Sequence, residues 1–401
     1  TVEKQIVKNV EDAAGKTRVF CFGIGNDVNT HLLDKITEST RALSQYVLPS
    51  EDIEVKVSRF YAKINDPVMA DPEVEVSGEA KLKQFYPKTL PDLFKGDQAV
   101  MMGRYSGEGA GDLLLTGLVN GKEVKMEYPV EFVGETKEHS FIPRLWATRR
   151  VGYLLDEIRL HGKNKELKDE VTTLARKYGI VTPFTSYLIL EDEGANNVAA
   201  NQRLLPGLQA NPRARQALRE NWRAMQNQKS GAGAVAAARA GQQLRYSNLP
   251  LTFNVQIPPL QPNLAALGFS TLSAKTPDAH LQQVESYRLR AFGQGAQQYQ
   301  QAVQKAQARA AGLRPGPAAA AGGGAGGGPA VQFVSGKSFY LNAGRWIDSE
   351  IQTLQTLKTK TKKIPIKFGS PEYFKLVTDK PAVLKWISLG KHVEFVLDGI
   401  H

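Results

Sequence analysis

Residues 141–193 constrain the fold of this chain more than any other segment, because they contain two successive helical patterns followed by an apolar run. Apolar side chains recur there at intervals of three and four residues, which places them on one face of a helix. The first set is Val151, Leu154, Leu155 and Ile158, and the second is Leu167, Val171, Leu174 and Tyr178. Gly179 directly follows the second set and predicts a left-handed helix C-cap. The β-prone run 180–190 predicts a buried strand.

The same segment carries ordered motifs that resemble a known family. The motifs are Leu145-Trp146-Ala147, Leu154-Leu155, Tyr178, Val181-Thr182-Pro183 and Thr185-Ser186. They resemble the inter-alpha-trypsin inhibitor heavy chains and their bacterial relatives, in which a vault-type (VIT) domain precedes a von Willebrand factor A domain. The resemblance extends backward to about residue 17. It implies that 141–193 form a helical hairpin followed by a strand, as in the heavy chains.

Residues 17–24 form an apolar run of the kind expected for a parallel strand that is covered on both faces. Asn26 or Asp27 is a candidate N-cap for the helix that follows, whose apolar face is Leu32, Leu33 and Ile36. This strand and helix resemble the last strand and last helix of a von Willebrand factor A domain, and 2–14 resemble the preceding helix. We therefore predict that 1–48 are the C-terminal part of such a doubly wound α/β domain.

The metal-binding loops of an A domain are absent from these 401 residues, which contain no Asp-x-Ser-x-Ser sequence. A strand that is buried on both faces requires neighbouring strands, so 1–48 should not fold alone. We expect the chain to be the C-terminal part of a longer protein and to associate with the N-terminal portion of the same protein. The resemblance implies that this other portion holds a divalent cation, Mg²⁺ or Ca²⁺.

Residues 49–140 combine a connecting helix with a β-rich module. The amphipathic pattern of 51–64 predicts the helix within a connecting segment at 49–64, with Ser50 as its candidate cap. Strand patterns occupy 74–76, 98–105, 112–119 and 122–133 within a module at 65–140, and Asn120-Gly121 predicts a hairpin between the last two. The resemblance implies a β-sandwich that is completed by strands from before the A domain, which leaves open edges in this chain.

The net charge of +11 lies in one segment, because 194–330 contain 14 Lys/Arg and 3 Asp/Glu (14 − 3 = +11) and the rest of the chain balances. This segment is rich in Ala, Gln, Gly and Pro, a composition typical of an extended or disordered tether. Its stretches 212–240 and 277–313 are compatible with helices. It is either a solvated linker or a basic tether for an acidic partner surface. An excess of positive charge that is confined to one segment argues against nucleic acid as the partner.

Residues 331–401 predict a small α+β domain. We expect a hairpin from 337–340 and 344–347, a strand at 364–368, helices at 371–378 and 381–387, and a final strand at 392–397. The predicted fold class is therefore multidomain α/β plus β-sandwich, with the helical hairpin of 141–193 and this α+β domain. No run approaches the eighteen apolar residues of a membrane span.

Two groups of residues are candidate interaction sites. Gly107, Gly109 and Gly111 lie between two predicted strands and form either a flexible hairpin loop or a contact loop for a partner. The second group is a polar set around the first helix of 141–193. It comprises Arg144, Arg149, Arg150, Asp156, Glu157, Arg159 and His161. Residues of this kind usually form a solvated helix face with a few ion pairs. We predict Arg144, Arg149 and Arg150 as interaction residues.

No grouping of residues points to an enzyme. The six histidines are scattered without zinc spacing, Cys21 is the sole cysteine, and no G-x-S-x-G sequence occurs. The Asp-Pro-His tripeptide of heavy chains that become esterified to a glycosaminoglycan is also absent. We therefore predict no catalytic, cofactor-binding or metal-binding residue in this chain.

The resemblance implies a non-enzymatic adhesion protein that binds protein partners at the bacterial cell envelope or exterior, with this chain as scaffold for the metal-dependent A domain. The alternative is a structural subunit of a surface layer, fibre or other extracellular assembly, built as a homo-oligomer.

Overall fold

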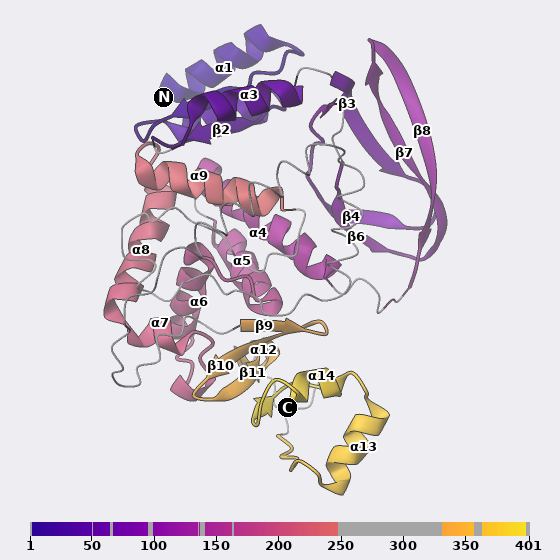
Figure 1. The fold of residues 1–401 in the computed structure, drawn as a ribbon, viewed down its shortest axis with the longest axis vertical. Coiled ribbons are helices and arrows are strands. Elements are labelled where there is room, and N and C mark those ends of the chain that lie inside the picture. The colour runs from indigo at the N-terminus through magenta and orange to yellow at the C-terminus, as the bar shows by residue number, and fades with distance from the viewer. Residues whose placement is uncertain are drawn as a thin grey trace, which may run out of the picture. The chain divides into compact units, whose positions relative to one another are not determined.

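The structure is a computed structural model of the 401-residue chain (Figure 1). The residues it describes are 2–49, 51–64, 67–94, 99–134, 136, 141–162, 164–247, 331–356 and 363–397. Within these ranges it combines helices with antiparallel and parallel sheets. The mixed α and β character expected from the sequence is therefore confirmed.

A group of helices forms the main hydrophobic core (Figure 1). The helices are α4 (Ile142–His161), α5 (Lys165–Tyr178), α6 (Pro183–Ala195), α7 (Pro206–Ala210), α8 (Pro212–Asn227) and α9 (Ala232–Arg245), with a short 3-10 turn at Ala200–Gln202. The apolar face predicted for α4 is fully buried, and that of α5 packs against the same core. Gly179 ends α5 in the left-handed conformation, with φ 63°. Both helices and their boundary are confirmed.

The strand predicted at 180–190 is wrong, because this run forms helix α6. The Thr182 side chain accepts a hydrogen bond from the Thr185 backbone, and the Thr185 side chain accepts one from the Thr182 backbone. Pro183 occupies the first turn, where its missing N–H costs nothing. The helix is buried on several sides, so it lacks the one-sided periodicity that would distinguish it from a strand.

The tether predicted to begin at residue 194 is wrong for residues 194–247, which include helices α7 to α9. Most of α9 is buried, and its small side chains allow it to pack closely against α4. The helical stretch predicted at 212–240 is confirmed by α8 and α9, which are separated by residues 228–231. Residues 248–330, with the possible helix at 277–313, lie outside the described residues.

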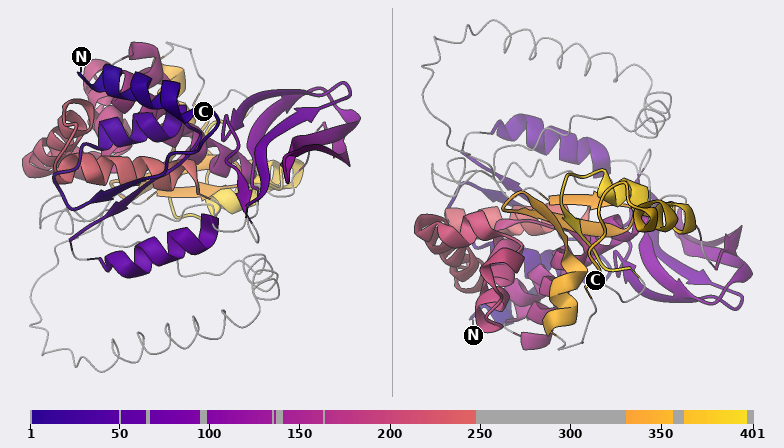
Figure 2. Two further views of the ribbon diagram at one scale, coloured as in Figure 1. Left: turned by 90° about the horizontal axis from the view of Figure 1, so that it is seen from above. Right: turned by 90° about the horizontal axis from the view of Figure 1, so that it is seen from below.

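The N-terminal segment folds as alternating helices and strands. They are α1 (Val2–Ala14), β1 (Cys21–Ile24), α2 (Thr30–Ser39), β2 (Ser44–Val47) and α3 (Ile53–Ile64). β1 and β2 are parallel, with α1 and α2 on one side and α3 on the other (Figure 2).

Two details of this segment differ from expectation. Asn29 caps α2, with its side chain accepting from the Leu32 backbone, so neither Asn26 nor Asp27 is the cap. Helix α3 packs through Phe60 on two phenylalanines, Phe20 and Phe22, but Ile53, Val57 and Tyr61 on its predicted apolar face are exposed. The predicted cap Ser50 lies outside the described residues.

The β-rich module contains two antiparallel sheets. Its strands are β3 (Pro67–Val76), β4 (Lys81–Tyr86), β5 (Leu93–Phe94), β6 (Met102–Ser106), β7 (Gly109–Val119) and β8 (Lys122–Phe132). One sheet has the order β5-β3-β7-β8, and the other pairs β4 with β6. The predicted hairpin joins β7 to β8, with Asn120 at φ 51° and Gly121 at φ 75°. These positive angles are those of the tight turn that the dipeptide favours.

The C-terminal segment forms a four-stranded sheet with short helices. Its elements are β9 (Val331–Val334), β10 (Lys337–Asn342), β11 (Arg345–Asp348), α12 (Ser349–Thr356), α13 (Pro371–Asp379), α14 (Val383–Ile387) and β12 (Val393–Glu394). The hairpin and both late helices are confirmed, whereas the strand predicted at 364–368 is wrong. Tyr340 on β10 is fully buried, and its hydroxyl donates to carbonyls near the end of α5. The sheet is therefore packed on the helical core.

None of the described helices is both long and apolar enough to cross a membrane.

Candidate functional site

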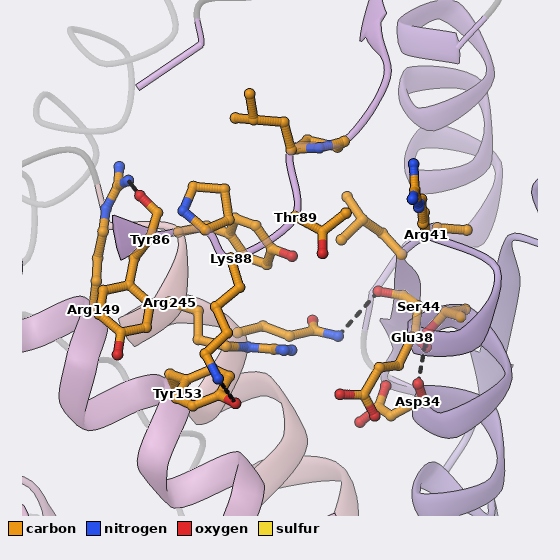
Figure 3. Close-up of a pocket in the computed structure, with 18 of the residues that line it drawn as sticks. Asp34, Glu38, Arg41, Ser44, Tyr86, Lys88, Thr89, Arg149, Tyr153 and Arg245 are labelled. Carbon is orange, nitrogen blue, oxygen red and sulfur yellow. Dashed lines mark hydrogen bonds between the residues drawn. The ribbon is translucent and has the colours of Figure 1, made fainter. Parts of the chain in front are cut away.

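A polar cavity of about 160 Å³ lies where α2, the segment after β4, α4 and α9 meet (Figure 3). We call it the junction cavity. Its polar lining side chains are Asp34, Thr37, Glu38, Arg41, Ser44, Tyr86, Lys88, Thr89, Arg149, Tyr153, Gln242, Arg245 and Tyr246. These residues come from segments more than 200 positions apart in the chain, so the cavity exists only in the folded protein.

A chain of buried charges forms one side of this junction. Arg159 on α4 donates to Asp34 on α2 and, from Nε, to Asp156 at 3.0 Å. Arg245 on α9 extends the chain, with its Nε 2.7 Å from the second oxygen of Asp156. The Tyr46 hydroxyl on β2 donates to the remaining oxygen of Asp34 at 2.6 Å. Two carboxylates and two guanidinium groups thus bind three helices to each other.

The buried carboxylates and guanidinium groups stabilise one another's charged forms. The Asp34 and Arg159 side chains are 5% and 4% exposed, so they receive little solvation from water. Burial works against the charged form of Arg159, but Asp156 and Asp34 overcome it and raise the pKa of this guanidinium. Removing one member would leave an uncompensated charge in a site of low dielectric.

Further titratable groups line the junction cavity or lie beside it. Lys88 donates to the Tyr153 hydroxyl at 2.6 Å (Figure 3). Burial raises the pKa of this tyrosine, and its hydrogen bond with Glu157 adds to the effect. Burial also raises the pKa of the Glu38 carboxyl, while His161 opposes the shift. These groups therefore combine carboxylates with cations and a phenol.

The three predicted interaction arginines all find partners within the chain. Arg149, which lines the junction cavity, donates to the carbonyls of Ser247 at 3.0 Å and Val100 at 2.6 Å. Arg150 donates to both carboxylate oxygens of Glu170, at 2.7 and 2.6 Å, and also to the Tyr86 hydroxyl.

The third arginine, Arg144, lies over the Phe333 ring at 5.6 Å, and burial lowers its pKa. These contacts of the three arginines hold distant segments of the chain together.

The three glycines lie apart from the cavity, at the connection between β6 and β7. Gly107 has φ 91° and Gly109 has φ 118°, angles that other residues rarely adopt. A Cβ on Gly111 would collide with the backbone carbonyl of Ser77. The backbone geometry by itself accounts for all three glycines, and their use as a contact loop stays a prediction.

Sequence reasoning missed the burial of Asp156 and Arg159, which it assigned to a solvated helix face. Their exposed fractions are 4% and 6%. It also missed Asp34 and Tyr46. The one local signal was an Asp three residues before an Arg on α4, a spacing compatible with an ion pair, but it does not reveal burial.

Sequence comparison connects the chain with a family of animal proteins. It is 26% identical over 228 residues to inter-alpha-trypsin inhibitor heavy chain 4 of Mus musculus, a match that covers 53% of this chain and 24% of the relative. It is 23% identical over 301 residues to heavy chain H2 of Sus scrofa, covering 71% of this chain and 29% of the relative. The chain is a homologue of the inter-alpha-trypsin inhibitor heavy chains. No family model matches it.

This heavy-chain homologue spans about a quarter of the length of the relatives that it matches. Solved structures give weaker likenesses. The ArnB paralog VWA2 from Sulfolobus acidocaldarius has a TM-score of 0.29 and 7% identity, with 57% of this chain and 55% of that chain covered. A von Willebrand factor type A protein from Catenulispora acidiphila has a TM-score of 0.28 and 14% identity, with 46% and 54% covered. TM-scores this low do not establish the fold.

Proposed function

We propose that this heavy-chain homologue is a non-enzymatic protein-interaction module of the bacterial cell envelope or exterior. In this proposal it is the scaffold of a von Willebrand factor A domain whose remaining strands belong to another portion of the protein. The sequence similarity to the heavy chains supports a protein-interaction role.

The observation that carries the proposal is the open edge of β1. Among the described strands β1 pairs with β2 alone, in a parallel sheet of two strands. Parallel sheets are normally larger and covered on both faces. The side chains of Cys21, Phe22 and Ile24 in β1 are nevertheless not fully buried, and Ile24 is 57% exposed. Further strands from another polypeptide segment would pair with β1 and cover these side chains.

The residues of this chain do not fit the divalent cation of an A domain. No Asp-x-Ser-x-Ser sequence is present, and the buried carboxylate of α2, Asp34, already binds Arg159 and Tyr46. The adhesion cation would therefore be held by the other portion of the protein.

The test is to purify the protein from its native source and to determine intact masses and peptide coverage. We expect a co-purifying polypeptide that contains Asp-x-Ser-x-Ser, and we expect EDTA to abolish binding of the protein ligand. A preparation that contains this chain alone, and that binds a protein ligand equally well with and without EDTA, would contradict the proposal.

A structural subunit of an extracellular assembly is the second candidate. Strand β8 is eleven residues long and pairs only with β7 among the described strands, so its outer edge is open to another copy. Electron microscopy of concentrated protein distinguishes the two candidates. Repeated contacts that bury well above ~1,000 Å² would favour assembly, and a monodisperse particle would favour the interaction module.

A further inference from the structure

We propose that Glu38, Glu157 and His161 form a binding site for one divalent transition-metal ion of the zinc class, which clamps α2 to α4. One potential ligand atom from each side chain lies within 4.8 Å of the other two. The site differs in donor chemistry and in position from the A-domain cation, and it extends beyond the proposed function.

The placement of the three side chains follows from the helices. Glu157 and His161 are four residues apart in the last turns of α4, so they lie on one face of that helix. Glu38 comes from the last turn of α2, which packs against α4 through the buried Asp34–Arg159 pair. That buried pair fixes the separation of the two helix ends. The side chains of Glu38, Glu157 and His161 therefore lie close to one another.

The donor set suits zinc better than magnesium or calcium. An imidazole nitrogen with two carboxylate oxygens is a typical ligand set for zinc and its neighbours, whereas magnesium and calcium prefer oxygen ligands alone. In a tetrahedral site with bonds of about 2.1 Å, neighbouring ligand atoms lie about 3.4 Å apart. His161 Nε2 and Glu38 Oε2 are already 3.6 Å apart. Small side-chain rotations would bring Glu157 to the same separation.

The local charges also favour a bound cation. Among the described residues, neither Glu38 nor Glu157 forms an ion pair with a lysine or arginine, and the Glu38 carboxylate faces His161. The nearest guanidinium, that of Arg245, is bound to Asp156. A divalent cation would offset the two negative charges at this position.

The site is accessible to an ion from solution. The side chains of Glu38 and His161 are both 49% exposed, so a metal ion can enter and a water molecule can complete its coordination. Glu38 also lines the junction cavity. A bound ion would therefore add a second connection between α2 and α4 beside the buried charges.

The experiment is a titration of the metal-free full-length chain with ZnCl₂ by isothermal calorimetry, and with CoCl₂ by visible absorption. The variants are Glu157→Gln and His161→Gln, which change exposed or half-buried side chains, with circular dichroism to confirm the fold. The matched control is His392→Gln, because His392 is an exposed histidine in the C-terminal segment.

We expect saturable 1:1 binding, with zinc raising the thermal midpoint of unfolding. Each site variant should bind at least about tenfold more weakly, and the control should bind as the parent does. Absence of saturable binding, or equal affinity in the parent and both site variants, would overturn the proposal.

Discussion

Gly152→Ala is the substitution whose effect follows most directly from the packing of α4 on α9. A Cβ at this position would lie 2.6 Å from Leu244 Cβ and 2.7 Å from the Arg245 backbone nitrogen. Both atoms belong to the α9 backbone or are fixed to it, so rotation of a side chain cannot relieve the contact. The two helices would have to separate by about 1 Å to restore ordinary carbon–carbon distances.

The expected magnitude is the difference between two effects of opposite sign. Alanine in place of glycine within a helix stabilises it by up to about 1 kcal/mol. Overpacking of a well-packed core typically costs about 1–3 kcal/mol. Separation of α4 from α9 also lengthens the 2.7 Å contact between Asp156 and Arg245, which adds to the cost because the Asp156 side chain is only 5% exposed. We expect Gly152→Ala to lower the free energy of unfolding by about 2 kcal/mol.

Urea denaturation followed by tryptophan fluorescence measures this loss, because Trp146 and Trp222 lie in the same helical core. The matched control is Gly194→Ala in α6, where a new Cβ would have no neighbour within 4 Å. This control should be as stable as the parent, or more stable by a few tenths of a kcal/mol. A Gly152→Ala protein at least as stable as the parent would refute the reasoning about the helix contact.

Three further predictions concern single side chains. Arg159→Met leaves two buried carboxylates without their shared cation and should cost about 3–5 kcal/mol in urea denaturation; a loss below about 1 kcal/mol would contradict the buried charge chain. The bidentate bond from Arg239 holds the pKa of Glu51 at about 2 against an ordinary 4.5, so its contribution is present above pH 4.5 and is lost as the pH falls toward 2. After solvent screening this contribution is about 1–2 kcal/mol, and the stability difference between the parent and Glu51→Gln should shrink between pH 6 and pH 3; a constant difference would count against it. Thr182→Ala removes the cap of α6 and should cost about 1 kcal/mol in thermal unfolding, whereas an unchanged midpoint would show that packing alone holds this helix.

The elements that sequence predicted correctly depend on near neighbours in the chain. The faces of α4 and α5, the left-handed end of α5 at Gly179 and the turn at Asn120-Gly121 follow from periodicity and from the steric freedom of glycine and asparagine. Ordered motifs between residues 145 and 186 also indicated the similarity to the heavy chains. These features require no knowledge of distant contacts.

The misassigned elements depend on contacts with distant residues. Residues 180–190 form a helix because the core surrounds them, although their apolar composition alone suits a strand equally well. The tether assigned to 194–330 is wrong for 194–247, although helix at 212–240 was foreseen, because the small side chains of α9 allow this helix to approach Gly152 closely. Composition cannot reveal that a matching surface exists elsewhere in the chain.

The sequence by itself determined the apolar faces of α4 and α5, the end of α5 at Gly179 and the likeness of its motifs to those of the heavy chains, because these are properties of short stretches of residues. The tertiary structure decided which charges are buried. Asp34 meets Arg159 across 125 positions, and Glu38 meets His161 across a similar separation. The packing of α2 on α4 excludes water from these groups and brings their charges close together, and this decides whether they are solvated, paired or able to hold a metal. A local sequence pattern contains no information about the distance between side chains of the two helices.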